Sequence, residues 1–324
     1  MRISPNDSNS YRYITLPNKM RLLLISDESA QKSAAALAVQ VGHFDDPIER
    51  QGLAHFLEHM LFLGTQKYPK EGEFQNFINQ HGGSHNAWTG TEHSAFFFDI
   101  TPSIFEEALD RFSQFFTAPL FNESALDKER QAVESEYKLK VKDDTRRLYQ
   151  VHKETINPEH PFAKFSVGNL DTLSDANGVS IRDEIVQFHT QHYSADLMTV
   201  AVMGPQSLDT LEQWATPRFA KIHNNNLAGK TINIPFVTAD QTGTFNHVCP
   251  IKELRKLVFS FPMPGMDAHY RSKPLSYFAH LLGYEGKGSF MIALKDKGWI
   301  HSLSAGGGVH GSNYREFTIG MQLT

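Results

Sequence analysis

Residues 52–64 read GLAHFLEHMLFLG, and this segment is the strongest indication of both fold and chemistry in the chain. Apart from His55, Glu58 and His59, nearly every residue between its two glycines is apolar. We expect a helix here that is buried on most sides and stops at Gly64. His55 and His59 are four residues apart, so both imidazoles project from one face of such a helix. Glu58 follows His55 by three residues, and its carboxylate lies over the same face.

Two imidazoles and a carboxylate with this spacing can hold one zinc ion and a water molecule beside a base. The order H-x-x-E-H is the inverzincin signature, the reverse of the commoner H-E-x-x-H. A hydrolytic zinc site needs a third protein ligand. Glu129 and Glu136 are seven residues apart in a segment of helical character, so they share a face. Chemistry alone leaves both open as the third ligand.

Composition excludes several classes of protein. The 324 residues suggest about two domains, and 40% of them are hydrophobic. The net charge is −5 and no long basic block is present, so we expect no nucleic-acid partner. No apolar run approaches the length of a membrane span, about 18 residues. The single cysteine, Cys249, rules out an internal disulfide. With no apolar signal core in the first residues, this favours a cytoplasmic over a periplasmic location, although the compartment stays open.

Helical and strand patterns follow one another through the whole chain. They predict an α+β fold with mixed, largely antiparallel sheets flanked by helices. We expect strands at 11–16, 20–26, 34–41, 95–100, 198–203, 257–261, around 300–304 and at 317–323. We expect helices at about 51–63, 71–81, 103–116, 124–141, 182–192, 273–283 and 288–297.

The segment 222–246 is rich in Asn, Gly and Pro and has little periodicity, which is typical of a linker. We therefore expect a metal-bearing domain over 1–228 and a second domain over 229–324. The final strand pattern stops without a turn or a polar tail, so the second domain is expected to be only a first part.

The chain closely resembles the insulinase or pitrilysin family (M16) of zinc peptidases, nearest the branch of insulin-degrading enzyme and pitrilysin. The matching pieces cover almost the whole chain: GLAHFLEHMLFLGTQKYP, SHNAWTGTEHSAFFFDI, DRFSQFFTAPLF, ERQAVESE, NPEHPFAKFSVGN, LLGYEGKGSF and LKDKGWI. The resemblance implies tandem related domains that enclose peptides in a clamshell of two halves. It also implies that Glu136 is the third zinc ligand and that Glu129 supports the site from behind.

The function implied is that of a zinc-dependent metalloendopeptidase acting on oligopeptides, with Zn2+ as its cofactor. Glu58 would be the base that takes a proton from the attacking water. The resemblance to the family also implies that Asn86, Ala87 and Trp88 belong to an edge strand with which the substrate backbone pairs. An ordinary edge strand with a packed Trp88 is the alternative.

Two further alternatives concern the whole chain. The family's second half supplies substrate-binding residues that no position here matches, so we expect it as a partner and expect this chain alone to be weakly active or inactive. The chain could instead be a non-catalytic half-shell that binds peptides or a partner subunit. A purely structural zinc site would require four protein ligands.

His81 and His85 are also four residues apart, but Gly82 and Gly83 between them argue against a helix and a second metal site.

Overall fold

The computed structural model describes residues 3–176 and 178–324. Their contacts divide the chain into two compact units. We call them unit 1 (Met1–Tyr137 and Lys164–Gly229) and unit 2 (Lys138–Ala163 and Lys230–Thr324). Each unit is a largely antiparallel sheet flanked by helices, so the predicted α+β class is confirmed. A domain boundary at 228/229 stays a prediction. None of the helices in the described residues is long and apolar enough to span a membrane.

Unit 1 is built on a six-stranded sheet in the order β1-β2-β6-β3-β5-β4. All neighbouring strands are antiparallel except β2 and β6, which are parallel. The sheet ends at β4, which in the described residues pairs with β5 alone. The strands are β1 Ser10–Thr15, β2 Arg21–Ser26, β3 Ser33–Val39, β4 Ser84–Thr89, β5 Ser94–Ile100 and β6 Met198–Gly204.

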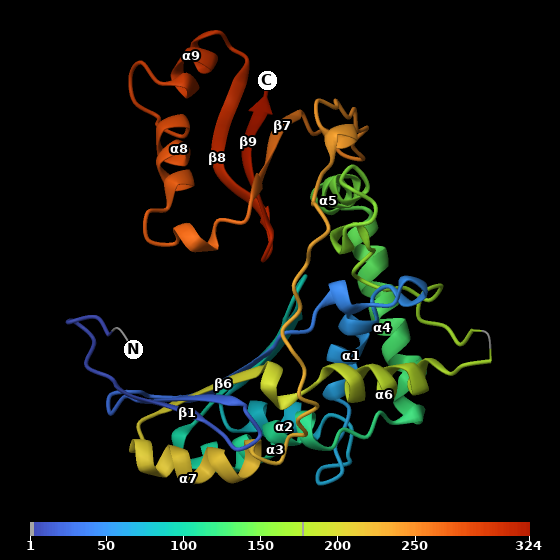
Figure 1. Ribbon diagram of the computed structural model, residues 1–324, viewed down its shortest axis with the longest axis vertical. Coiled ribbons are helices and arrows are strands. Elements are labelled where there is room, and N and C mark those ends of the chain that lie inside the picture. Colours follow the sequence, from blue (N-terminus) through green and yellow to red (C-terminus); the bar gives the residue numbers. More distant parts are fainter. Residues whose placement is uncertain (1–2, 177) are drawn as a thin grey trace. The chain divides into compact units, whose positions relative to one another are not determined.

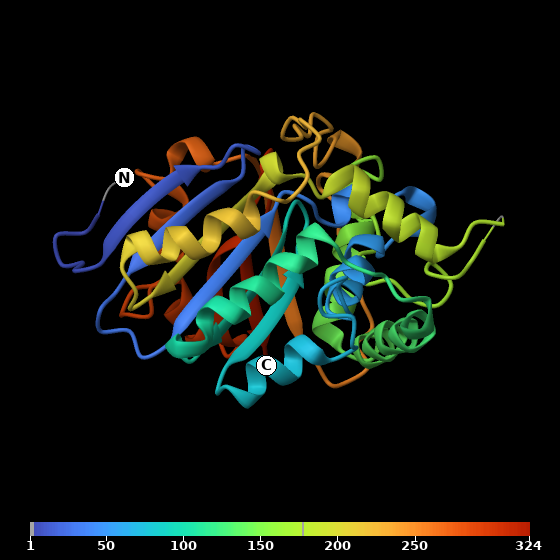
Figure 2. The ribbon, with the colours of Figure 1, turned by 90° about the horizontal axis from the view of Figure 1, so that it is seen from below.

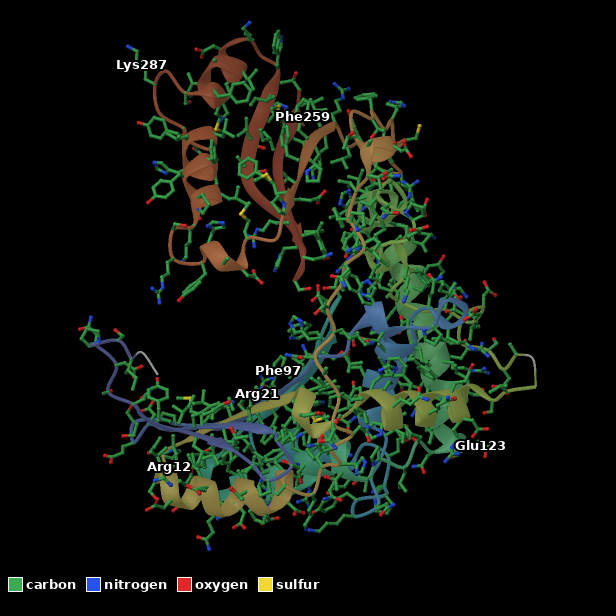
Figure 3. All side chains as sticks on the ribbon, in the orientation of Figure 1. Arg12, Arg21, Phe97, Glu123, Phe259 and Lys287 are labelled. Carbon is green, nitrogen blue, oxygen red and sulfur yellow. The ribbon has the colours of Figure 1, made fainter. Side chains whose placement is uncertain are left out.

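One face of this sheet is covered by α3 (Phe105–Thr117) and α7 (Leu208–Phe219), which also pack against each other. Figure 2 shows both helices lying over this face of the sheet. The strands alternate buried and partly exposed residues, as the period of two requires. Phe96 and Phe98 of β5 enter the core and meet Phe112 and Phe116 of α3. Among the described residues of unit 1, no helix covers the opposite face in this way, and Phe97 is 39% exposed there (Figure 3).

The remaining helices of unit 1 lie near the β4 end of the sheet. Helix α1 packs against β4, and α2 packs against β4, β5 and α3. Helix α4 begins in unit 1 and its last residues belong to unit 2. The bounds are α1 Leu53–Leu61, α2 Glu73–Gln80, α4 Glu123–Val141 and α6 Ile181–His192.

Unit 2 contains a three-stranded sheet in the order β7-β9-β8, with α8 and α9 against β8. Residues 138–163 join this unit through an aromatic cluster in which the rings of Phe236 and Tyr314 stack 4.3 Å apart beside Phe162. The elements are α5 Asp144–Glu154, β7 Lys256–Pro264, α8 Pro274–Leu282, α9 Phe290–Asp296, β8 Ile300–His310 and β9 Tyr314–Leu323.

The two units repeat one topology. In unit 1, β3 is followed by α1, α2 and the hairpin β4–β5, and the strands pair in the order β3-β5-β4. In unit 2, β7 is followed by α8, α9 and the hairpin β8–β9, paired in the order β7-β9-β8. The tandem repeat of related domains is therefore confirmed. Helix α8 occupies the place of α1, but its sequence PLSYFAHLL has one histidine and no carboxylate.

Two helices were not anticipated. Helix α5 reads DTRRLYQVHKE, which is too polar to present an apolar stripe, and its Asp143 cap gave the only local signal. Helix α7 contains Pro217, a residue that normally argues against a helix interior. Pro217 lies in the last turn, where the helix is about to end. The expected linker over 222–246 has no α-helix or strand, in agreement with its composition.

Candidate metal centre

The two histidines of α1 project from one side of the helix, as their spacing predicts. The helix begins after Gly52, whose φ of 94° lies in the left-handed region and suits glycine. Leu53, Phe56 and Leu57 are buried in the core of unit 1 and fix the helix in rotation. On the remaining face, the Nε2 atoms of His55 and His59 lie 3.3 Å apart.

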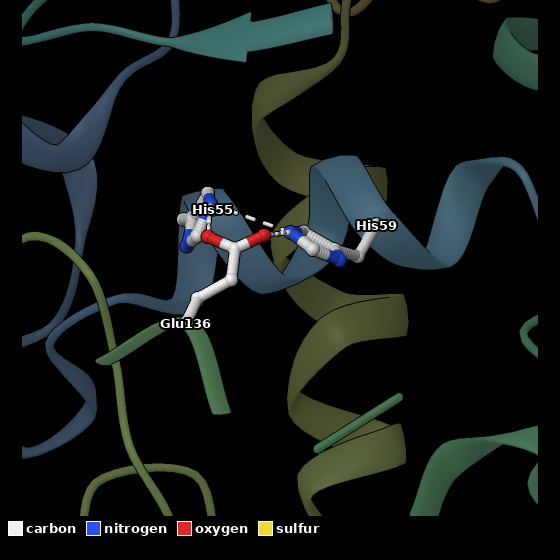
Figure 4. Close-up of side chains that lie close together, drawn as sticks. All are labelled: His55, His59 and Glu136. Carbon is white, nitrogen blue, oxygen red and sulfur yellow. Dashed lines mark hydrogen bonds and ion pairs between the residues drawn. The ribbon is translucent and has the colours of Figure 1, made fainter. Parts of the chain in front are cut away.

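Helix α4 brings Glu136 to the same place (Figure 4). One carboxylate oxygen of Glu136 lies 3.8 Å from Nε2 of His59, and the other lies 4.0 Å from Nε2 of His55. Ligand atoms about 2.0–2.2 Å from a tetrahedral zinc ion are separated by about 3.4 Å. The observed separations fall close to this value, so the three side chains fit one metal ion. They form the one cluster of three His, Cys, Asp or Glu side chains with such geometry in the described residues.

Hydrogen bonds to the far side of each imidazole fix which nitrogen faces the cluster. Nδ1 of His55 lies 2.7 Å from the backbone oxygen of Val167, and Nδ1 of His59 lies 2.6 Å from Oε1 of Glu129. Both partners can only accept, so each neutral ring carries its proton on Nδ1 and presents a lone pair at Nε2. Two lone pairs and a carboxylate therefore converge, an arrangement that requires a cation or a proton between them.

Electrostatics agree with this arrangement. Burial by itself lowers the pKa of His59. The hydrogen bond that His59 donates to Glu129, together with the negative charges of Glu129, Glu136 and Glu58, outweighs burial, and the pKa of His59 is raised above its ordinary value. The centre therefore favours positive charge.

Glu58 lies next to the cluster on the same helix and is buried, with 8% exposed. Its Oε2 accepts a hydrogen bond of 2.5 Å from the hydroxyl of Thr89 in β4. The structure thus joins the helix of the histidines to the edge strand of the sheet. The part played by Thr89 was not anticipated from the sequence, because a threonine at the end of a strand is an ordinary β residue.

Asp46 is another contributor without a sequence signal. It is 2% exposed, and its carboxylate accepts hydrogen bonds of 2.7 Å from the backbone N–H groups of Gly52 and Ala54. These N–H groups begin α1 and have no partner within the helix. Asp46 lies six residues before Gly52, outside the usual capping spacing, so no capping pattern reveals it.

The three residues expected at the edge strand lie in β4. Asn86 and Trp88 are exposed, and Ala87 is partly buried. The N–H of Ala87 donates to the side-chain oxygen of Asn86, at 3.0 Å, rather than to another strand. Trp88 is 44% exposed and its ring meets that of His93 edge-on.

The other histidines singled out earlier lie away from the cluster. His81 follows α2 and bonds to the backbone oxygen of Phe77. His85 lies in β4 between the rings of Phe62 and Phe74, where burial lowers its pKa. Neither belongs to a metal-like cluster in the described part of the chain.

Comparison with known proteins agrees with this geometry. A sequence model described as insulinase (peptidase family M16) matches residues 21–159, and one described as the peptidase M16 inactive domain matches residues 180–324. The chain belongs to the insulinase family, M16. Its first match includes every residue of the candidate metal centre up to Glu136.

Among M16 relatives, the A-factor-processing enzyme of Saccharomyces cerevisiae is 42% identical over 321 residues. The insulin-degrading enzyme of Homo sapiens is 42% identical over 324 residues. These alignments cover 98% and 99% of this chain but 31% and 32% of the relatives. A relative from Schizosaccharomyces pombe, 37% identical over 308 residues (94% of this chain and 32% of the relative), carries the words zinc protease in its name.

The crystal structure of pitrilysin superposes with a TM-score of 0.94 at 35% identity, covering 100% of this chain and 35% of pitrilysin. The chain thus spans about a third of the length of the relatives that it matches. The M16 membership agrees with the repeated topology of the two units. It supports peptidase function at the level of the family.

Proposed function

We propose that this chain carries the catalytic centre of a zinc-dependent endopeptidase that hydrolyses peptide bonds in oligopeptides. His55, His59 and Glu136 would hold the zinc ion. The observation that supports this most directly is the convergence of two Nε2 lone pairs and a carboxylate, with both ring tautomers fixed by acceptors behind them.

A zinc ion held by His55, His59 and Glu136 would supply Lewis-acid chemistry, which activates water and polarises a carbonyl group. Three protein ligands leave a fourth position for that water. A structural zinc site would use four protein ligands, and the described residues bring three together. This count favours a hydrolytic site.

Glu58 is the proposed base. It takes the proton of the attacking water and later delivers a proton to the leaving amine. Its buried position on the same helix as the two histidines places its carboxylate beside the proposed metal ligands. Glu129 is proposed to orient His59 and to raise the basicity of its Nε2 by accepting the Nδ1 proton.

We propose that the substrate backbone adds to the free edge of β4 along Asn86, Ala87 and Trp88. The N–H of Ala87 supports this proposal, since it is held by a neighbouring amide oxygen that an incoming strand can replace. The exposed Trp88 offers apolar area to a peptide side chain. Peptides would thus bind beside Thr89 and Glu58.

The relatives are about three times as long as this chain. We therefore propose that the C-terminal half of such an enzyme, which lies in the two thirds that this chain does not match, is the partner that completes the substrate chamber. The chain alone is expected to be weakly active or inactive. A non-catalytic half-shell is the second candidate, and it is favoured by the match of residues 180–324 to a domain described as inactive.

Mass-spectrometric detection of peptide cleavage tests the proposal. The zinc-loaded chain, alone and mixed with the second half of an M16 enzyme, is incubated with a peptide of about 20–30 residues. Cleavage that disappears in Glu58→Gln, a variant that retains zinc, is the expected result. Cleavage that persists in Glu58→Gln would reject the assigned base. Zinc binding without cleavage in either mixture would favour the half-shell.

A further inference from the structure

We propose that Thr89 is the positioning residue of Glu58, because its hydroxyl fixes the orientation of the Glu58 carboxylate. Thr89 belongs to β4, so this orientation depends on the same strand that is proposed to bind the peptide. The inference rests on the proposed function for its kinetic consequence, but its structural part stands independently.

The contact between the two residues is direct. The Thr89 hydroxyl lies 2.5 Å from Oε2 of Glu58, whose side chain is buried. Alternation along β4 directs Ala87 and Thr89 to its partly buried side and Asn86 and Trp88 to its exposed side. The same strand therefore offers its edge and its exposed side chains to solvent while one hydroxyl reaches the proposed base.

The direction of the hydrogen bond follows from the neighbouring groups. An ionised carboxylate can only accept, so Thr89 is the donor to Glu58. The hydroxyl of Ser94 lies 3.4 Å from that of Thr89, and it donates a hydrogen bond of 2.8 Å to the backbone oxygen of Val41. Ser94 donates its proton to Val41 and not to Glu58. The hydroxyl of Thr89 is therefore the group that donates to the Glu58 carboxylate and stabilises it in one orientation.

The turn that carries Thr89 is itself held in place. The backbone N–H groups of His43 and Phe44 donate to the backbone oxygens of Gly90 and Thr91, each at 3.0 Å. Gly42 packs so closely on these two carbonyls that a β-carbon there would collide with them. The hairpin turn after Thr89 is thus attached to residues 42–44.

The helix that carries Glu58 is attached to the same loop. Asp46 accepts from the N–H groups of Gly52 and Ala54 at the start of α1, and Lys164 donates to the backbone oxygens of Phe44 and Asp46. One short loop, residues 42–52, therefore fixes both the turn next to Thr89 and the helix of Glu58. The contacts of residues 42–52 therefore set the distance between Thr89 and Glu58, and this distance does not depend on their single hydrogen bond alone.

A peptide that pairs with β4 would press on the strand that carries this hydroxyl. Binding of the peptide and orientation of the base are then properties of one rigid element. This accounts for a threonine at the strand end, since valine has the same shape but cannot donate.

The first experiment compares crystal structures of the wild-type chain, Thr89→Val and Thr89→Ser. We expect Glu58 to leave its observed rotamer in Thr89→Val and to keep it in Thr89→Ser. Thr101→Val is the matched control, because it also removes one hydroxyl bond, to the backbone oxygen of His81 at 2.7 Å. An unchanged Glu58 rotamer in Thr89→Val would overturn the proposal, whether or not the chain hydrolyses peptides.

The second experiment measures kinetics of the chain with its second half. A hydrogen bond to a charged group is stronger than one between neutral groups, so kcat should fall at least about tenfold in Thr89→Val. KM and zinc content should stay near wild type, and Thr89→Ser should restore most of kcat. Equal kcat for Thr89→Val and wild type would contradict the inference. A wild type that cleaves nothing would instead count against the proposed function and leave the crystallographic test in force.

Discussion

The imidazole of His59 donates through Nδ1 to Oε1 of Glu129, 2.6 Å away, while its Nε2 faces Glu136 at 3.8 Å. One carboxylate of α4 thus stands behind the ring and another in front of it. Residues 129 and 136 are two helical turns apart, so they share a face of α4 but reach opposite sides of the His59 ring. The spacing of Glu129 and Glu136 left both open as the third metal ligand, but in the structure Glu136 faces the cluster and Glu129 lies behind His59.

The position of Glu129 predicts its effect on metal binding. Glu129→Gln should weaken zinc binding by about tenfold and Glu129→Ala by up to about a hundredfold, because His59 loses its charged acceptor. Competition with a chromophoric chelator measures the affinity. Glu134→Gln is the control on the same helix, since that carboxylate accepts from the N–H of Leu170 instead, and it should leave the affinity unchanged. An equal loss in both variants would refute the assignment.

Asp46 should stabilise α1 from outside the helix. Its replacement by alanine removes two hydrogen bonds to a helix N-terminus and should lower the free energy of unfolding by at least about 1–2 kcal/mol. Urea unfolding followed by circular dichroism measures the change. Asp183→Ala is the control, since that residue is exposed in the first turn of α6 and should matter little. The cap has no importance if both variants unfold alike.

Gly42 should resist substitution for a steric reason. A β-carbon at this position would overlap the backbone oxygens of Gly90 and Thr91, both of which are fixed by the hairpin turn. Gly42→Ala should therefore lower the Tm of zinc-free protein and displace the turn next to Thr89. Gly306→Ala is the control, because a β-carbon there meets nothing within 4 Å. Identical Tm values would show that the loop yields easily.

His189 predicts part of the dependence of stability on pH. Burial against Phe121 and Tyr193 lowers the pKa of His189 to about 4. In the unfolded chain the ring titrates near 6.5, so between pH 6.5 and 4 the unfolded state binds the extra proton. The free energy of unfolding therefore decreases as the pH falls through this window, by up to about 3 kcal/mol.

Urea unfolding at pH 7.5 and pH 4.5, for wild type and His189→Gln, measures this contribution. The variant should lose less stability on acidification than wild type does. The same loss in both proteins would mean that His189 does not account for the pH dependence.

The sequence allowed part of this account to be predicted. His55, Glu58 and His59 are recognisable because helical spacing and chemistry coincide in one short segment. Glu136 required the family resemblance, since Glu129 has the same residue type and face. The α+β class followed from strands and helices with clear periodicity, whereas α5 was missed for want of an apolar stripe.

The supporting contacts could not be predicted, for physical reasons. Val167 contributes a backbone oxygen, which every residue has. Asp46 and Thr89 act across distances that only the folded loop and hairpin establish. Their side chains also have ordinary local explanations, as a loop acid and a strand threonine. Such residues become visible when the atoms that they contact are known.

A crystal structure of the zinc-loaded chain, with anomalous data at the zinc edge, tests the proposed metal centre most directly. We expect one ion bound to Nε2 of His55, Nε2 of His59 and a carboxylate oxygen of Glu136, each at about 2.0–2.2 Å, with a water molecule in the fourth position. The ion should be lost in His59→Ala and kept in Glu58→Gln. An ion held by four protein ligands, or bound elsewhere with this centre left empty, would contradict this proposal.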